Sequence, residues 1–166
     1  MSKVLLLTGP GGAGKTTIAK LLEKKQGYFW LDADQADTEF FPDGKHWLPE
    51  NKAKLRLAHN KIFQKTKEIY DGGKDVVLDY IIFGHYMEFI DKFKNTFGDD
   101  FKIKVLLPSI DEMITRDAER EVWTTGADRI KAVSAEFEEI KDRIGIENYI
   151  DTSGMSAEEV ITKYLN

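Results

Sequence analysis

The sequence feature that most constrains this chain is a glycine-rich segment that lies between an apolar run and a helical pattern. Residues 9–16 read Gly-Pro-Gly-Gly-Ala-Gly-Lys-Thr and directly follow the mainly apolar residues 3–8. Glycines let successive backbone N–H groups turn inward around an anion, because no Cβ blocks the approach. A helix that begins at this point adds the positive end of its dipole to the same site. The segment therefore predicts a strand, a phosphate-binding loop and a helix in succession.

The residue types within this loop indicate that the phosphates belong to a nucleoside triphosphate. Lys15 has the reach to contact the β- and γ-phosphates, and the Thr16 hydroxyl can ligate Mg²⁺. We therefore predict that the chain uses ATP and Mg²⁺. Contacts to the nucleotide are expected from the loop and the first helical residues, namely Gly9, Gly11, Gly12, Ala13, Gly14, Lys15, Thr16 and Thr17.

Composition excludes several other classes of protein. The 166 residues are expected to form one domain, residues 1–166, and the net charge of −5 argues against a nonspecific grip on nucleic acid. No cysteine is present, so disulfides and thiolate metal sites are excluded, which suits a cytoplasmic protein. The first apolar run, of about five residues, is too short for a signal peptide or a membrane span.

Hydrophobic periodicity predicts strands that alternate with helices. Apolar runs over 28–31, 76–78, 101–107 and 146–150 read as strands, and the helical stripes lie over 16–25, 51–70, 86–93 and 130–144. Two further helices are expected after Ser109 and Ser156, because each serine has a glutamate three residues later, as in a capping box. Residues 35–50 contain two prolines and a glycine and are expected to form a loop.

Alternating elements of this kind predict an α/β fold with a parallel sheet covered on both faces. Ligands of such sheets bind outside the carboxyl ends of the strands. Asp32, Asp79 and Pro108 each fall at one of these ends, as does the start of the glycine-rich loop. The candidate chemistry therefore converges on one edge of the sheet.

At this point the chain resembles the small P-loop kinases, a group that includes shikimate, gluconate and adenylate kinases, chloramphenicol phosphotransferase and polynucleotide kinases. Four motifs carry the resemblance, which are the loop at 9–16, Leu31-Asp32-Ala33-Asp34, the stretch from Pro108 through Arg116 to Arg120, and Ile150-Asp151-Thr152-Ser153. The resemblance implies a three-layer P-loop NTPase fold, with a five-stranded parallel sheet in the order 2-3-1-4-5 and a mobile lid near residues 116–130.

The same resemblance implies roles for individual residues. In that family one arginine of the pair lies beside the adenine and one over the phosphates, which places Arg116 in nucleotide binding and Arg120 in catalysis with Lys15. Thr152 corresponds to the small polar residues that line the adenine site. A carboxylate after the second strand, here Asp34, faces the acceptor hydroxyl.

Physical reasoning supports the carboxylate roles independently of the resemblance. Phosphoryl transfer needs a held γ-phosphate, neutralised charge and a positioned hydroxyl whose proton is removed. Asp34 is our choice for the base that takes this proton. Asp32 would then hold Mg²⁺ through water, and Asp79, which follows three apolar residues, competes for the same metal role.

Simpler interpretations of these residues stay open. Asp32 and Asp34 have the residue type that favours turns and helix caps. Arg116 and Arg120 are one helical turn apart, and Glu112 lies four residues before Arg116. A solvated helix face that carries ion pairs would show the same spacing.

The acceptor region is expected around Lys45, His46, Trp47 and Arg56, a set of side chains that suits an anionic or hydroxylated ligand with a flat face. The favoured function is an ATP-dependent phosphotransferase that acts on a hydroxyl of a small-molecule or nucleotide-like acceptor. The alternatives are a nucleotide-hydrolysing switch and a 5′-hydroxyl polynucleotide kinase. The acidic balance does not favour nucleic acid, and the chain lacks the Asn-Lys-x-Asp signature of guanine recognition.

Overall fold

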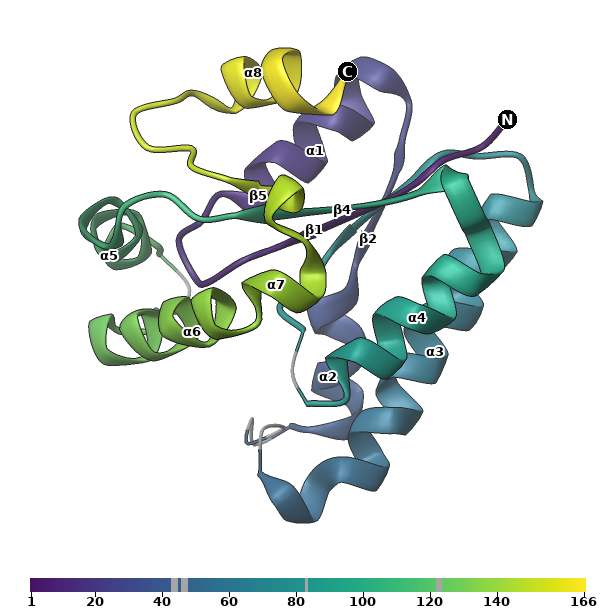
Figure 1. Ribbon diagram of the computed structural model, residues 1–166, viewed down its shortest axis with the longest axis horizontal. Helices are drawn as coiled ribbons and strands as arrows, with labels where there is room; N and C mark the ends of the chain where they lie inside the picture. The colour runs from purple at the N-terminus through teal and green to yellow at the C-terminus, as the bar shows by residue number, and fades with distance from the viewer. Residues whose placement is uncertain (43–44, 46–47, 83, 122–123) are drawn as a thin grey trace.

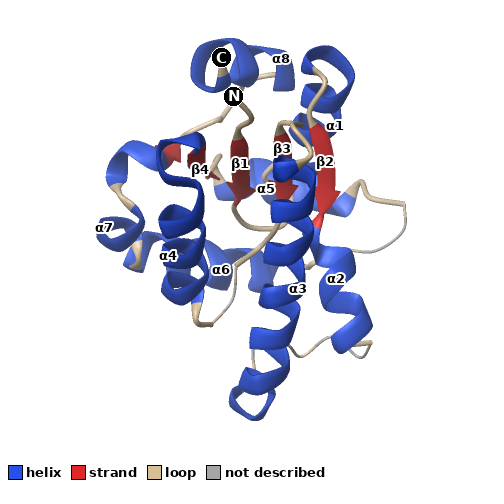
Figure 2. Ribbon diagram, turned by 90° about the vertical axis from the view of Figure 1, so that its right-hand side faces the viewer, coloured by secondary structure: helices blue, strands red, loops and turns tan. Residues whose placement is uncertain are grey.

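The computed structural model describes residues 1–42, 45, 48–82, 84–121 and 124–166. Its strands form one five-stranded sheet in the order β2-β3-β1-β4-β5, and every neighbouring pair is parallel. Figure 2 shows β4, β1, β3 and β2 side by side at the centre of the molecule. The predicted fold class and strand order are therefore confirmed. The strands are β1 (Val4–Thr8), β2 (Phe29–Asp32), β3 (Val76–Asp79), β4 (Phe101–Leu106) and β5 (Tyr149–Ile150).

Helices cover both faces of the sheet. Figure 1 shows α1 and α8 on one side of the strands, with α3, α4, α6 and α7 on the other. No helix within the described ranges is long and apolar enough to cross a bilayer. The α-helices are α1 (Lys15–Gln26), α2 (Ala33–Phe40), α3 (Lys52–Asp71), α4 (Tyr86–Phe97), α5 (Ile110–Ala118), α6 (Ala127–Glu139), α7 (Lys141–Ile144) and α8 (Ala157–Val160).

The alternation of side chains along the central strands divides the core into two layers. Leu6 and Leu78 point into the layer that contains α3, α4 and α6, whereas Leu7 and Val77 point into the layer that contains α1 and α8. All four side chains are fully buried. Because both faces of a parallel sheet are covered, its strands read as continuous apolar runs rather than alternating ones.

The helix α2 contradicts the loop predicted over residues 35–50. The chain is helical over Ala33–Phe40, and the backbone N–H groups of Asp34 and Gln35 hydrogen-bond to the Asp32 carboxylate. The turn-forming prolines and glycine all follow this helix in the sequence, so they indicate a loop only for the second half of residues 35–50. Positions 43, 44, 46 and 47 of the predicted loop lie outside the described residues.

The last third of the chain also differs from the prediction. The helix expected over 130–144 is divided into α6 and α7, and the strand expected over 146–150 is reduced to the two residues of β5. Gly145, with a φ of 104°, turns the chain after α7, and a 3-10 turn over Ile146–Asn148 follows it. The helix ends at Ile144 as expected, whereas the apolar Ile146 led the expected strand to begin within this turn.

The two predicted capping boxes behave differently. At α8 both hydrogen bonds between Ser156 and Glu159 are present. At α5 the Ser109 hydroxyl accepts from the Glu112 N–H, but the Glu112 carboxylate accepts from the Gly154 N–H at 2.9 Å. The start of α5 is thereby connected to the loop between β5 and α8, which lies beside the site described below.

A buried histidine forms part of the layer beneath α3 and α4. His59 is 7% exposed, its Nε2 lies 3.1 Å from the hydroxyl oxygen of Tyr80, and its ring centroid lies 4.8 Å from that of Phe89. Burial lowers the pKa of His59 from 6.5 to about 4, with a smaller contribution from the charge of His85. The folded protein therefore favours the neutral imidazole.

This histidine predicts a specific loss of stability in acid. The pKa of His59 is near 6.5 in the unfolded chain and near 4 in the folded protein, so between these pH values the unfolded chain binds a proton that the folded protein does not. The contribution of His59 to the free energy of unfolding is therefore fully present above pH 6.5 and is lost as the pH falls toward 4. We expect His59 to account for about 2 kcal/mol of lost unfolding free energy between pH 7.5 and pH 5. Urea denaturation of the wild type and of His59→Gln at both pH values measures this contribution. Equal losses in the two proteins would contradict it.

Candidate active site

The glycine-rich loop joins β1 to α1 and is closed in by two neighbouring elements. A Cβ at Gly9 would lie 2.3 Å from the carbonyl oxygen of Leu106 at the end of β4. A Cβ at Gly12, where φ is 75°, would lie 2.2 Å from the carbonyl oxygen of Met113 in α5. Glycine is therefore required at both positions by the close packing of β4 and α5, as well as by the backbone conformation.

Lys15 lies inside the curve of this loop. Its side chain is buried, and its Nζ donates hydrogen bonds to the carbonyl oxygens of Gly9 and Pro10, each at 2.9 Å. Burial lowers the pKa of Lys15, whereas the charges of Asp79 and Asp34 act in the opposite direction. The ammonium group is thus held by neutral carbonyls at the centre of a loop whose glycines can present N–H groups to phosphate.

Two carboxylates and a hydroxyl meet at the end of β2 and β3. Asp32 and Asp79 are paired in register on these adjacent strands, and the Thr16 hydroxyl donates to Asp79 Oδ2. Burial and the nearby charge of Asp79 raise the pKa of Asp32, although the hydrogen bonds from the Asp34 and Gln35 N–H groups oppose this shift. Asp32 therefore serves as a helix cap as well as lying beside the candidate metal position.

These oxygens fit a magnesium ion. Asp79 is 1% exposed, and its Oδ1 is buried without a hydrogen-bond partner among the described residues. Mg²⁺ prefers oxygen ligands and keeps several waters, so it needs few protein ligands besides the phosphates. No group of three or more His, Cys, Asp or Glu side chains that could hold a metal occurs within the described part of the chain. The arrangement suits a nucleotide-bound Mg²⁺ rather than an ion enclosed by protein.

One open cavity of about 890 Å³ brings most of the predicted catalytic residues together. Lys15, Thr16, Asp32, Asp34 and Arg120 all line it, together with Gly11, Gly14 and Thr17. Asp34 comes from the first turn of α2 rather than from a loop. Lys20 and Trp30 also line this cavity, although neither belongs to a motif that predicted them. The Lys20 Nζ lies 5.0 Å from the centroid of the Trp30 ring.

A second cavity of about 130 Å³ adjoins the other side of the loop. Arg116 and Thr152 line it with Ala13, Gly14 and Thr17, so the structure brings the residues predicted near the adenine into contact with one space. The remaining lining residues are mainly apolar and come from α1 and from the segment that enters α8, namely Ile18, Met155, Ala157 and Val160. A narrow, mainly apolar slot with one guanidinium at its rim has the chemistry that suits a flat base.

The two arginines each pair with an acid and also line a cavity. Arg116 Nη2 lies 3.6 Å from Glu112 Oε1, and Arg120 Nη1 lies 3.7 Å from Asp117 Oδ1. Arg120 was expected one helical turn after Arg116, but α5 ends at Ala118, so Arg120 lies beyond the helix. The ion pairs agree with the simpler interpretation, whereas the cavity positions agree with the family role.

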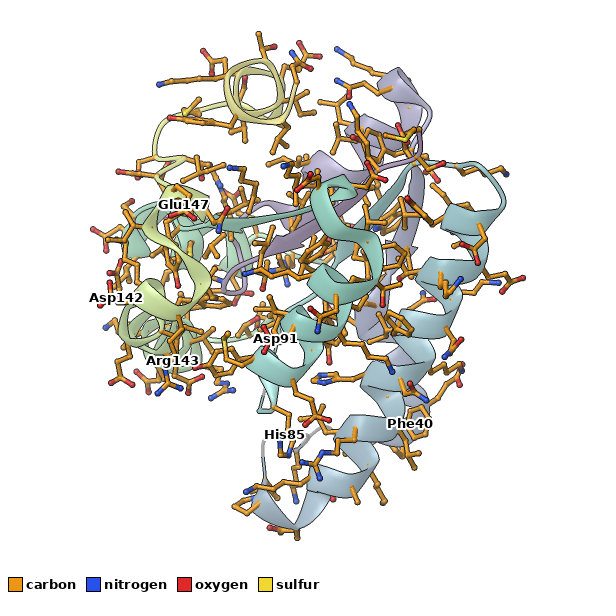
Figure 3. The ribbon with its side chains drawn as sticks, turned by 45° about the vertical axis from the view of Figure 1, so that its right-hand side comes forward. Phe40, His85, Asp91, Asp142, Arg143 and Glu147 are labelled. Atoms are coloured by element: carbon orange, nitrogen blue, oxygen red, sulfur yellow. The ribbon has the colours of Figure 1, made fainter. Side chains whose placement is uncertain are left out.

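Of the four residues expected around the acceptor, the structure describes Lys45 and Arg56. Lys45 is exposed, and His46 and Trp47 lie outside the described residues. Arg56 lines a different cavity, of about 280 Å³, between α3 and α4. Its guanidinium pairs with Glu88 at 3.3 Å and lies 3.5 Å from Nδ1 of His85, whose position at the start of α4 Figure 3 shows. Among the residues predicted for the acceptor side, Asp34 is the one that lines the cavity with Lys15.

Comparison with known families matches most of the chain. The model of the AAA domain family matches residues 4–145, which include the phosphate loop and all of β1 to β4. A cytidylate kinase of Thermodesulfovibrio yellowstonii is 32% identical over 85 residues, a stretch that spans 46% of this chain and 38% of that protein. The chain thus matches well under half of the length of this curated relative.

Solved structures share the fold over nearly the whole chain. A sugar kinase from Janibacter sp. HTCC2649 has a TM-score of 0.76 at 16% identity and covers 99% of this chain and 93% of its own. The shikimate kinase of Acinetobacter baumannii, solved with shikimate, has a TM-score of 0.65 at 18% identity, with coverage of 99% and 92%. At such low identities the likeness concerns the fold, and at that level it confirms the resemblance to small P-loop kinases.

Proposed function

The chain belongs to the AAA domain family, and we propose that it is an ATP-dependent phosphotransferase that moves the γ-phosphate to a hydroxyl group. One observation carries the proposal, which is that the Asp34 carboxylate and the Lys15 ammonium line the same cavity and are close enough for their charges to interact. A phosphate-holding cation thus lies near a carboxylate that can accept a proton. The names of the similar proteins, which are kinases of sugars, shikimate and cytidylate, support the same class of reaction.

Different side chains of the cavity have different roles in the proposed phosphoryl transfer. Lys15 leaves its carbonyl partners and donates to the β- and γ-phosphates, and Arg120, which lines the same cavity, contacts the transferring group. Thr16 and Asp79 would hold Mg²⁺, which, when bound, neutralises phosphate charge. In this proposal, positive charge stands where negative charge develops in the transition state.

Asp34 acts on the acceptor side of the cavity. As the acceptor oxygen bonds to phosphorus and the bond to the β-phosphate oxygen breaks, the Asp34 carboxylate takes the hydroxyl proton. Its position in the first turn of α2 keeps it on a rigid element, and the same turn is capped by Asp32. Asp32 is therefore better suited to fixing α2 than to serving as a second base.

The charge of the cavity favours a hydroxyl acceptor over a phosphate acceptor. A second phosphate needs cations beyond those that hold the triphosphate. Apart from Lys15 and Arg120, the described lining of the cavity offers only the cation of Lys20, against the carboxylates of Asp32, Asp34 and Glu121. A hydroxylated acceptor with at most one anionic group fits this balance.

A screen of acceptors tests the proposed function directly. ATP consumption is measured with Mg²⁺ against sugars, cyclitols, nucleosides, hydroxylated antibiotics and nucleoside monophosphates, and the product is identified by mass. We expect a hydroxyl compound to raise turnover at least about tenfold above hydrolysis by water. Phosphorylation only of monophosphates would establish a phosphate acceptor instead. Hydrolysis that no compound accelerates would favour the nucleotide-dependent switch.

Closure of the predicted lid gives a further expected result. If Arg116 and Arg120 contact the nucleotide, hydrogen exchange over residues 116–130 should slow when a nonhydrolysable ATP analogue and Mg²⁺ bind. Closure would exclude water from the transferring group, which distinguishes a kinase from a simple ATPase. The exposed face of α4 serves as the internal control and should not change. Unaltered exchange over 116–130 would favour the interpretation of both arginines as surface ion pairs.

A further inference from the structure

Asp117 is one of two buried carboxylates among the described residues. It is 2% exposed, and the other such residue is Asp79. Asp117 lies in the last turn of α5, between the two arginines of the predicted lid. Nothing in the proposed chemistry uses it directly, although burying a charge is costly unless its partners compensate. The contacts of this side chain therefore need a separate explanation.

The carboxylate of Asp117 connects the end of α5 to the start of α6. Its Oδ1 accepts a hydrogen bond from the Thr125 N–H, and its Oδ2 accepts one from the Gly126 N–H, both at 2.9 Å. Gly126 is the N-cap of α6, so the negative charge also lies at the positive end of that helix. Burial alone would raise the pKa of Asp117, but these hydrogen bonds outweigh it and lower the pKa. The side chain is thus an anion whose partners lie eight and nine residues away.

The residues that Asp117 holds are in direct contact with the active site. A Cβ at Gly11 would lie 2.4 Å from the Thr125 Oγ1, so Thr125 packs against the phosphate loop itself. The oxygen that accepts from the Thr125 N–H, Oδ1, also lies 3.7 Å from Nη1 of Arg120, which lines the cavity with Lys15. The charge of Arg120 acts on Lys15 strongly enough to contribute to its lowered pKa. One buried anion therefore contacts both the segment that packs on Gly11 and the arginine that lines the cavity with Lys15.

We propose that Asp117 is a positioning residue for phosphoryl transfer, which acts by aiming Arg120 at the transferring phosphate and fixing Thr125 against Gly11. This inference rests on the proposed function, in which Arg120 stabilises the transition state. The position of a charged donor matters most when charge has moved onto the transferring group, because such interactions weaken steeply with misplacement. Asp117 should therefore affect the transition state more than the bound nucleotide.

The substitution Asp117→Asn tests this role, with Glu119→Gln as the matched control. Asparagine keeps the shape but places an NH₂ group against a backbone N–H, whereas Glu119 is an exposed acid in the same segment. We expect ATP turnover to fall about 30-fold in Asp117→Asn and to stay within about twofold of wild type in Glu119→Gln. Turnover of Asp117→Asn equal to that of the control would overturn the inference.

Two further measurements separate positioning from a purely structural role. The affinity for ADP with Mg²⁺ should change less than about threefold in Asp117→Asn, while that for ADP with tetrafluoroaluminate, a mimic of the transferring group, should fall about 30-fold. In an Arg120→Ala background, Asp117→Asn should cost less than a further threefold in turnover, because the main effect runs through Arg120 and only the contact of Thr125 with Gly11 is left to lose. Equal losses for both ligands, or effects of the two substitutions that multiply, would contradict the proposal.

The fluoroaluminate comparison also distinguishes this inference from the proposed function. If the wild type turns over no ATP with any acceptor, the proposed function fails, yet the ratio of the two affinities still decides whether Asp117 positions Arg120. If Asp117→Asn does not fold, Asp117→Ser replaces it, since a small hydroxyl leaves no misplaced amide in the buried site. The same ratio then applies.

Discussion

Replacement of Lys15 with methionine is expected to lower ATP turnover by at least about 10³-fold while the protein stays folded. The Lys15 ammonium is buried and donates hydrogen bonds to the carbonyls of Gly9 and Pro10, so a bound phosphate could take the place of these carbonyls as its partner. Methionine keeps most of the length and apolar volume of the side chain but removes the charge. Nucleotide affinity should also weaken, because the β- and γ-phosphates lose their buried cation.

The matched control for this prediction is Lys24→Met, since Lys24 is an exposed lysine on the same helix, α1. The measurements are steady-state turnover, calorimetric titration with an ATP analogue, and circular dichroism of all three proteins. Lys24→Met should match the wild type in each. Undiminished turnover in a folded Lys15→Met protein would show that this loop is not the active site.

Local chemistry and the period of the apolar pattern explain why most of the fold could be predicted. The loop at 9–16, the buried strand before it and the helix after it form a single contiguous signal, and all three occur as expected. The helix α2 was missed because its apolar residues, Ala33, Ala36 and Phe40, are few, and because the prolines and glycine that follow made the whole segment read as a loop. Its stability depends on the Asp32 cap and on packing against α3, which local sequence does not display.

The candidate site likewise contains residues that a local motif predicts and residues whose role depends on tertiary contacts. The contacts of Lys15 and Thr16 follow from one motif, and Arg116 and Thr152 were assigned only through the resemblance to kinases. Asp117 could not be assigned, because the string Arg116-Asp117-Ala118-Glu119-Arg120 looks like an ordinary charged helix surface. Its burial depends on a return of the chain that brings Thr125 and Gly126 back to α5. A local sequence pattern does not predict hydrogen bonds from Thr125 and Gly126 to Asp117, because they depend on how the chain turns between these residues.

Replacement of Asp34 with asparagine should separate a phosphotransferase from a nucleotide-dependent switch. We expect transfer to the acceptor to fall by about 10²-fold or more, the usual contribution of a positioned base. Affinity for ATP and Mg²⁺ should stay within about threefold of wild type, because the phosphate contacts come from the loop at 9–16 and the substitution is nearly isosteric. Hydrolysis by water should persist, since a water molecule needs less exact placement than a bound hydroxyl.

The measurement for Asp34→Asn is therefore a pair, namely nucleotide affinity by calorimetry and the ratio of phosphorylated acceptor to free phosphate. Glu39→Gln is the control, as it removes an exposed carboxylate from the same helix, where it pairs with Lys61 across the surface. A large loss of affinity in Asp34→Asn would assign this carboxylate to the metal. Wild-type transfer by the variant would instead place the base elsewhere, with Asp32, one residue before α2, the next carboxylate to test. A fall in transfer at constant affinity would leave Asp34 as the group that takes the hydroxyl proton, because only the acceptor's chemistry would have changed.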